Sequence, residues 1–203
     1  RSPMKWLSET DLGDIYGIPG PASLEKVADR LTPDYADFIR ASRFCVLTTV
    51  GPEGTDGSPR GDDGPVARAL DDKHLALPDW RGNDRIDSIR NITRDGRVSL
   101  MFLVRGSGNA IRVNGLARVT DDAELRASFT HQGKQPRTVI VVQVAEIYFQ
   151  CARAVIRAGL WAGVDDSAGL PTPGRILANM TGGRVGGDAY DTEWPVRAAK
   201  TMW

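Results

Sequence analysis

The sequence predicts a mainly β protein in which short helices connect the strands. Three apolar runs rich in β-branched residues, at 44–50, 98–104 and 139–149, are typical of buried strands. A further segment, 111–119, alternates apolar and polar residues, as a half-buried strand does. Clusters of glycine, proline, asparagine and aspartate between the runs mark turns. About six or seven such strands fit a small closed β-barrel with helical decoration, or else an open α+β sheet.

The chain up to residue 41 predicts a broken helical segment that packs over the barrel or forms a dimer arm. Ser23 is a suitable N-cap for a first helix. Thr32 followed by Pro33 predicts the start of a second helix, because proline is favoured at the first helical position.

The second strand is expected to begin at Ser58, after a turn at 51–57. The Gly-Asp-Asp-Gly sequence at 61–64 interrupts it, and it resumes at 66–70. A short strand at 75–77 follows. Pro78 is expected to close that strand, because proline cannot donate to a ladder.

Residues 78–83 predict a loop, because they combine proline, glycine, asparagine and aspartate. Asn83 or Asp84 is expected to cap the helix that follows. The apolar residues of this helix recur at three-residue spacing: Ile86, Ile89 and Ile92.

Two arginines, Arg81 and Arg85, lie on this loop and on the first turn of its helix. Guanidinium groups and helix-start amides together can bind a phosphate. A solvated loop with surface arginines fits the same residues.

Residues 111–161 predict two long strands and two helices. Gly115 shifts the alternation of the 111–119 strand and predicts a β-bulge. Thr120 or Asp121 caps a short helix, and a closing helix at 150–161 ends a domain that spans 1–161. Residues 162–203 form a C-terminal arm or tail with one helical patch at 174–180, either lying on a partner subunit or partly disordered.

Composition excludes several classes of function. Acidic and basic residues balance at 26 each, which gives no sign of a nucleic-acid partner. No apolar run approaches the roughly 18 residues that would predict a membrane span. Cys45 and Cys151 are too few for a disulfide scaffold, so a reducing cytoplasm is expected. His74 and His131 alone give little basis for a multi-histidine metal site or a histidine-based hydrolase triad, and no metal is expected.

Four sequence motifs occur in an order that resembles a known family. They are SPRGDDGP, ALPDWRGNDRIDSIRNI, VSLMFLVRGSGNAIRVNG and IYFQC, within residues 38–161. They resemble the FMN-binding split-barrel superfamily that contains pyridoxamine 5'-phosphate oxidase, and most closely its bacterial branch of oxidase-related FMN-binding proteins. The resemblance implies a split β-barrel, FMN as cofactor and a homodimer with two flavins at the interface.

The resemblance also implies a set of cofactor contacts. In the family, the strand that corresponds to the one holding Arg60 supplies backbone and arginine contacts to FMN. The family also has two basic residues at the positions of Asp84 and Arg85. Only one of the two is basic here, so Arg81 is expected to supply the second positive charge. Trp80 either stacks on the ring or packs structurally, and Asp63 is expected only to bond its own loop. The family glutamine that touches the flavin corresponds to Ala110 here, so this contact is either absent or made by Asn109. The expected contacts are Arg60, Gly61, Asp62, Leu77, Pro78, Trp80, Arg81, Asn83 and Arg85, with Arg137 and Thr138 where the second subunit reaches the cofactor.

The predicted function is an FMN-dependent oxidoreductase that acts on a small organic substrate; no catalytic residue is assigned. The parent oxidase activity is not expected, because those enzymes end in an arginine-histidine motif and this chain has no histidine after His131. Two alternatives stay open: a deazaflavin-dependent reductase on the same barrel, and a non-catalytic flavin- or haem-binding protein with His131 as axial ligand. Cys151, at a predicted helix start, fits either a redox role or a structural one.

Overall fold

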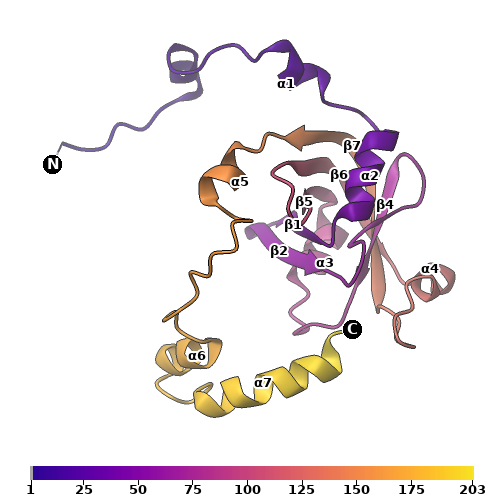
Figure 1. Cartoon of the computed structure of the whole chain (residues 1–203), viewed down its shortest axis with the longest axis vertical. Coiled ribbons are helices and arrows are strands. Elements are labelled where there is room, and N and C mark those ends of the chain that lie inside the picture. Colours follow the sequence, from indigo (N-terminus) through magenta and orange to yellow (C-terminus); the bar gives the residue numbers. More distant parts are fainter. Residues whose placement is uncertain (1) are drawn as a thin grey trace.

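The computed structural model describes residues 2–203, which form one antiparallel sheet with helices around it (Figure 1). The seven strands lie in the order β2-β1-β5-β6-β7-β4-β3. The strands are β1 (Phe44–Gly51), β2 (Gly54–Gly61), β3 (Arg68–Ala69), β4 (His74–Asp79), β5 (Arg97–Leu103), β6 (Ala110–Thr120) and β7 (Thr138–Gln150). The helices are η1 (Glu9–Asp14), α1 (Pro21–Glu25), α2 (Pro33–Ala41), α3 (Asp87–Arg94), α4 (Ala123–Ala127), α5 (Arg153–Ala158), α6 (Pro173–Thr181) and α7 (Asp188–Thr201).

The sheet curls so that its two ends approach each other. Arg60 on β2 and Asp79 at the end of β4 form an ion pair with 2.6 Å between Nη1 and Oδ1. Four strands separate β2 from β4 in the sheet order, so this contact is possible only across an open barrel. The predicted fold class, mainly β with helical decoration, is confirmed.

The barrel core comes from alternate positions of the central strands. Leu47, Leu100, Val113 and Ile147 are aligned by the register of β1, β5, β6 and β7, and each is at most 1% exposed. Burial of such a side chain stabilises the fold by about 2 kcal/mol.

The predicted bulge at Gly115 is confirmed by a register shift between Asn114 and Gly115. A Cβ at Gly115 would lie 2.1 Å from the carbonyl oxygen of Gln143. Glycine is therefore required there by the close approach of β7.

The prediction of one interrupted strand from Ser58 to residue 70 is wrong. The first part begins earlier, as β2, and pairs with β1; the second part is the separate strand β3, which pairs with β4. The two lie at opposite ends of the sheet order. Pro78 also lies within β4, opposite Val139, and does not close the strand. Proline is tolerated there because β3 reaches only Leu75 and Ala76, and the edge beside Pro78 has no ladder partner within residues 2–203.

Three predicted helix caps are wrong, although each helix exists. The helix expected from Ser23 begins after Gly20, α4 begins after Asp122, and α3 begins after Ile86. The predicted closing helix at 150–161 is the shorter α5. Thr32 does cap α2, where its hydroxyl accepts a hydrogen bond from the amide of Tyr35 at 3.3 Å.

The C-terminal segment forms two helices that lie apart from most of the barrel (Figure 1). The helical patch predicted at 174–180 is α6, whereas α7 was not predicted. The last residues of the chain return to the barrel beside β2 and β4 (Figure 1). Among residues 2–203, no helix is both long enough and apolar enough to cross a bilayer.

Candidate functional site

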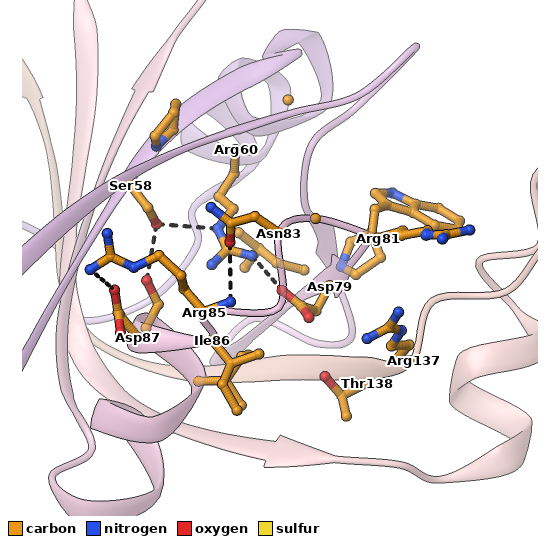
Figure 2. Close-up of a pocket in the computed structure, with 18 of the residues that line it drawn as sticks. Ser58, Arg60, Asp79, Arg81, Asn83, Arg85, Ile86, Asp87, Arg137 and Thr138 are labelled. Carbon is orange, nitrogen blue, oxygen red and sulfur yellow. Dashed lines mark hydrogen bonds and ion pairs between the residues drawn. The ribbon is translucent and has the colours of Figure 1, made fainter. Parts of the chain in front are cut away.

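A cavity of about 730 Å³ opens where the ends of β2 and β4 face each other. Its walls come from β2 and the residue after it, the end of β4, loop 80–86, the start of α3 and the start of β7 (Figure 2). A volume of this size is typical of a site for a cofactor or a small organic molecule.

The β2 wall presents polar groups in a row. Asp56, Ser58 and Arg60 of β2 line the cavity together with Asp62 just after the strand, as expected because every second residue of a strand faces the same side. Pro59 and Gly61 also line it. At a rise of about 3.3 Å per residue, this row extends over roughly 20 Å. The cavity is therefore long enough for an elongated ligand.

Hydrogen bonds connect the β2 row to α3. The hydroxyl of Ser88, on the first turn of α3, donates to Asp56 Oδ2 at 3.0 Å and lies 3.1 Å from the hydroxyl of Ser58. The Ser58 hydroxyl also accepts from Arg60 Nε at 3.3 Å. These contacts fix the start of α3 against β2.

Arg60 stands in the middle of this wall and is already partnered. It pairs with Asp79, and the two side chains are only 20% and 18% exposed. A guanidinium group has five N–H donors, so Arg60 keeps donors for a ligand while it holds β2 to β4 (Figure 2).

Loop 80–86 has an unusual backbone. Asp84 and Ile86 both have positive φ, at 62° and 52°, which residues other than glycine rarely adopt. Asn83 does not cap α3; its side-chain oxygen accepts from the amide of Arg85 at 3.1 Å. Ile86 occupies the N-cap position, so no side chain caps α3 within the described chain. The first amides of α3 thus stay available beside the cavity.

Four arginines line the cavity, and three of them pair with carboxylates. Arg85 lies 2.8 Å from Asp87, and Arg137 lies 2.6 Å from Asp84. Arg81 has no carboxylate partner among residues 2–203.

Three of these arginines, Arg81, Arg85 and Arg137, extend to two different sides of loop 80–86 (Figure 2). The Arg81 side chain lies on the same side of the loop as Arg137, and the Arg85 side chain extends to the opposite side, beside Ser58 (Figure 2). Arg81 and Arg85 were expected to act together as one basic pair. Their separation shows that they contact different parts of the cavity.

Trp80 is held by a hydrogen bond at one end of the cavity. Its indole N–H donates to Asp62 Oδ2 at 2.8 Å, and its ring meets His131 edge-on at 6.5 Å between centroids. Trp203 donates to the other oxygen of Asp62 at 3.0 Å and stacks on His131. Asp62 therefore joins two distant segments of the chain.

Thr138 contributes a buried hydroxyl with no hydrogen-bond partner among residues 2–203. The Nε2 atom of His131 is likewise buried without a partner, but His131 does not line this cavity. Thr138 is at the start of β7, opposite Asp79.

All the predicted contact residues lie around this one cavity: Arg60, Gly61, Asp62, Leu77, Pro78, Trp80, Arg81, Asn83, Arg85, Arg137 and Thr138. Arg137 and Thr138 line it in the same chain as the others, although they were expected to reach a partner's cofactor. Whether these residues bind a cofactor stays a prediction. The prediction omitted Asp56, Ser58 and Asp79, although the first two follow from Arg60 by strand alternation. It also omitted Met202, for which the sequence holds no local signal.

The two cysteines lie outside the cavity and are both free thiols. Burial raises the pKa of Cys45 to about 12. The pKa of Cys151 is lowered, mainly because the backbone amide of Arg153 at the start of α5 donates to its sulfur. Among residues 2–203, no group of three or more histidine, cysteine or acidic side chains could hold a metal ion.

The sequence pattern of the pyridoxamine 5'-phosphate oxidase family matches residues 31–151, more than half of the chain. The chain belongs to this family. The resemblance drawn from the four motifs is thereby confirmed, and the matched residues include the β2, β4 and loop 80–86 walls of the cavity. No curated protein matches the chain.

Solved structures with similar folds come from several bacteria. HupZ of Group A Streptococcus is 21% identical, with a TM-score of 0.48 over 59% of this chain and 93% of that one. General Stress Protein 26 of Bacillus anthracis is also 21% identical, with a TM-score of 0.42 over 56% and 88%. An FMN-binding protein of Syntrophomonas wolfei is 16% identical, with a TM-score of 0.43 over 57% and 87%.

Proposed function

We propose that this chain is an FMN-dependent oxidoreductase that acts on a small organic substrate, with the flavin in the cavity between β2 and β4. The observation that carries the proposal is the set of phosphate-binding groups around loop 80–86 in a pyridoxamine 5'-phosphate oxidase family chain. When bound, FMN would supply the redox chemistry, and the chain would bind it, orient it and exclude water.

The residues present fit a phosphorylated ligand. A buried hydroxyl without a partner costs about 1–3 kcal/mol, and a phosphate oxygen would satisfy Thr138. Arg81 is free of carboxylates in the described chain, and the ion pairs of Arg85 and Arg137 are exposed, so these arginines can change partner at little cost. The uncapped start of α3 adds amide donors.

Arg60 and the β2 row would contact the rest of the flavin. Gly61 lines the cavity through its backbone, and Arg60 can stabilise an anionic reduced ring.

The visible spectrum of the purified protein, with mass spectrometry of whatever heat releases, tests this proposal. A yellow protein that releases FMN supports it. Release of a deazaflavin, which also carries a phosphate, would instead support a deazaflavin-dependent reductase. A colourless protein that takes up neither ligand overturns the flavin proposal, and a Soret band would favour the haem alternative.

We also propose that two copies of the chain associate. Phe44 on β1 and Met101 on β5 share the outer face of the sheet, and they are 38% and 39% exposed. Apolar side chains grouped on an outer face are typical of a protein–protein contact. Light scattering after size-exclusion chromatography measures the mass of the particle, and a mass near 22.0 kDa would contradict a dimer.

A further inference from the structure

The residues after α7 contact the cavity, whereas the start of the helix is attached to α6 by Asp191, which accepts from the amide of Gly174 at 2.8 Å. No residue of α7 is buried in the described structure, and Trp194 on this helix is 52% exposed. Pro195 in its interior removes one helical hydrogen bond. Packing along the helix therefore does little to hold α7 against the barrel.

Contacts at the end of α7 attach it to the barrel. The indole N–H of Trp203 donates to Asp62 Oδ1 at 3.0 Å, and the Trp203 ring stacks on His131 with 4.2 Å between centroids. The ammonium of Lys134 also donates to the carbonyl oxygen of Lys200 at 3.2 Å. A hydrogen bond to a carboxylate is stronger than one between neutral groups, so Asp62 is the main polar anchor.

This attachment places Met202 on the cavity wall. Asp62 also holds Trp80, another lining residue, through its second oxygen. The position of α7 and the position of the Trp80 side chain thus depend on one carboxylate.

We propose that the residues at the end of α7 complete the binding site. Met202 would contact the ligand, and Trp203 would hold Met202 in position through its hydrogen bond to Asp62. The inference rests on the proposed function, since the ligand it concerns is the flavin or its substrate. It assigns the C-terminal helix to the pocket of its own chain, and it predicts that ligand retention depends on the Trp203–Asp62 hydrogen bond.

The first test uses the cofactor-free protein and does not depend on any ligand. Trp203→Phe keeps an aromatic ring for stacking on His131 and removes the N–H group. We expect backbone amides in the last turns of α7 to exchange hydrogen about tenfold faster, the size expected when one hydrogen bond to a charged group is lost. Trp194→Phe, on the same helix, is the matched control and should leave exchange unchanged. Equal exchange in the two variants would overturn the docking of α7.

The second test measures FMN binding by fluorescence quenching. Trp203→Phe should weaken binding about tenfold, and Trp194→Phe should not change it. Met202→Ala should weaken binding without faster exchange in α7, because it removes a ligand contact and leaves the anchor. Met180→Ala, an exposed methionine on α6, is its control.

The outcomes separate this inference from the proposed function. If the wild-type protein binds no FMN, the flavin proposal fails and the exchange experiment still tests the docking. If the wild-type, Trp203→Phe and Met202→Ala proteins bind FMN equally, the flavin proposal stands and the inference about α7 is wrong.

Discussion

Arg60 and Asp79 join the two ends of the curled sheet through a 2.6 Å ion pair inside the cavity. The pair brings together strands that share no ladder, because four other strands lie between β2 and β4 in the sheet order. Both residues of the pair also line the cavity. Stability of the barrel and shape of the site are thus connected at one contact.

Asp79→Ala should destabilise the protein by about 2 kcal/mol. The substitution leaves the Arg60 guanidinium, 20% exposed, without its carboxylate. Loss of one partner of a fully buried pair costs about 3–5 kcal/mol, and partial exposure reduces that cost. Urea denaturation measures the change. Asp63→Ala is the control, because the Asp63 side chain is 65% exposed and its pair with Arg43 contributes little. Equal midpoints for the two variants would contradict this role of Asp79.

Arg81→Ala combined with Arg85→Ala should weaken FMN binding about 100-fold and leave the circular dichroism spectrum unchanged. Each lost phosphate contact accounts for about tenfold. Because the two side chains lie on opposite sides of loop 80–86, we expect them to act independently, and each single variant should weaken binding about tenfold (Figure 2). Arg90→Ala, an exposed arginine of α3 outside the cavity, is the control. Unchanged cofactor retention in the double variant would remove the phosphate site from this loop.

The strands and the bulge could be predicted from sequence because their signals are local. The 44–50 run and the alternation around Gly115 depend on neighbouring residues only. The partner of a strand depends on residues far away, which is why β2 and β3 were joined into one strand. Composition could not show that they lie at opposite ends of the sheet order.

The site was predicted by family likeness more than by local pattern. Loop 80–86 departs from two local rules. The N-cap of α3 is Ile86, although an asparagine or aspartate was expected there, and this β-branched residue has a positive φ. Such departures concentrate at functional sites, where the surrounding structure holds a strained backbone. Met202 reaches the cavity only because α7 brings it there, and α7 contains Pro195, a residue that is unfavourable inside a helix.

Thr138→Val should weaken FMN binding and leave the free protein as stable as before, or slightly more stable. The Thr138 hydroxyl is buried without a partner in the described chain, so its removal takes away an unsatisfied polar group. Thr49→Val is the matched control. The Thr49 hydroxyl accepts from Asn91 Nδ2 at 3.0 Å in the core, so this variant should lose about 1–2 kcal/mol of stability. A loss of stability in Thr138→Val as large as in Thr49→Val would show that the hydroxyl is satisfied in the free protein.

Iodoacetamide should alkylate Cys151 in the native protein and leave Cys45 unmodified. The thiolate is the reactive form, and burial raises the pKa of Cys45 to about 12 and also blocks access. The pKa of Cys151 is lowered by the amide of Arg153, so its alkylation rate should reach half of its maximum at a pH below the ordinary thiol value. Peptide mass spectrometry across a pH series measures both sites. In urea the two thiols should react alike, and faster native labelling of Cys45 than of Cys151 would contradict the assignment.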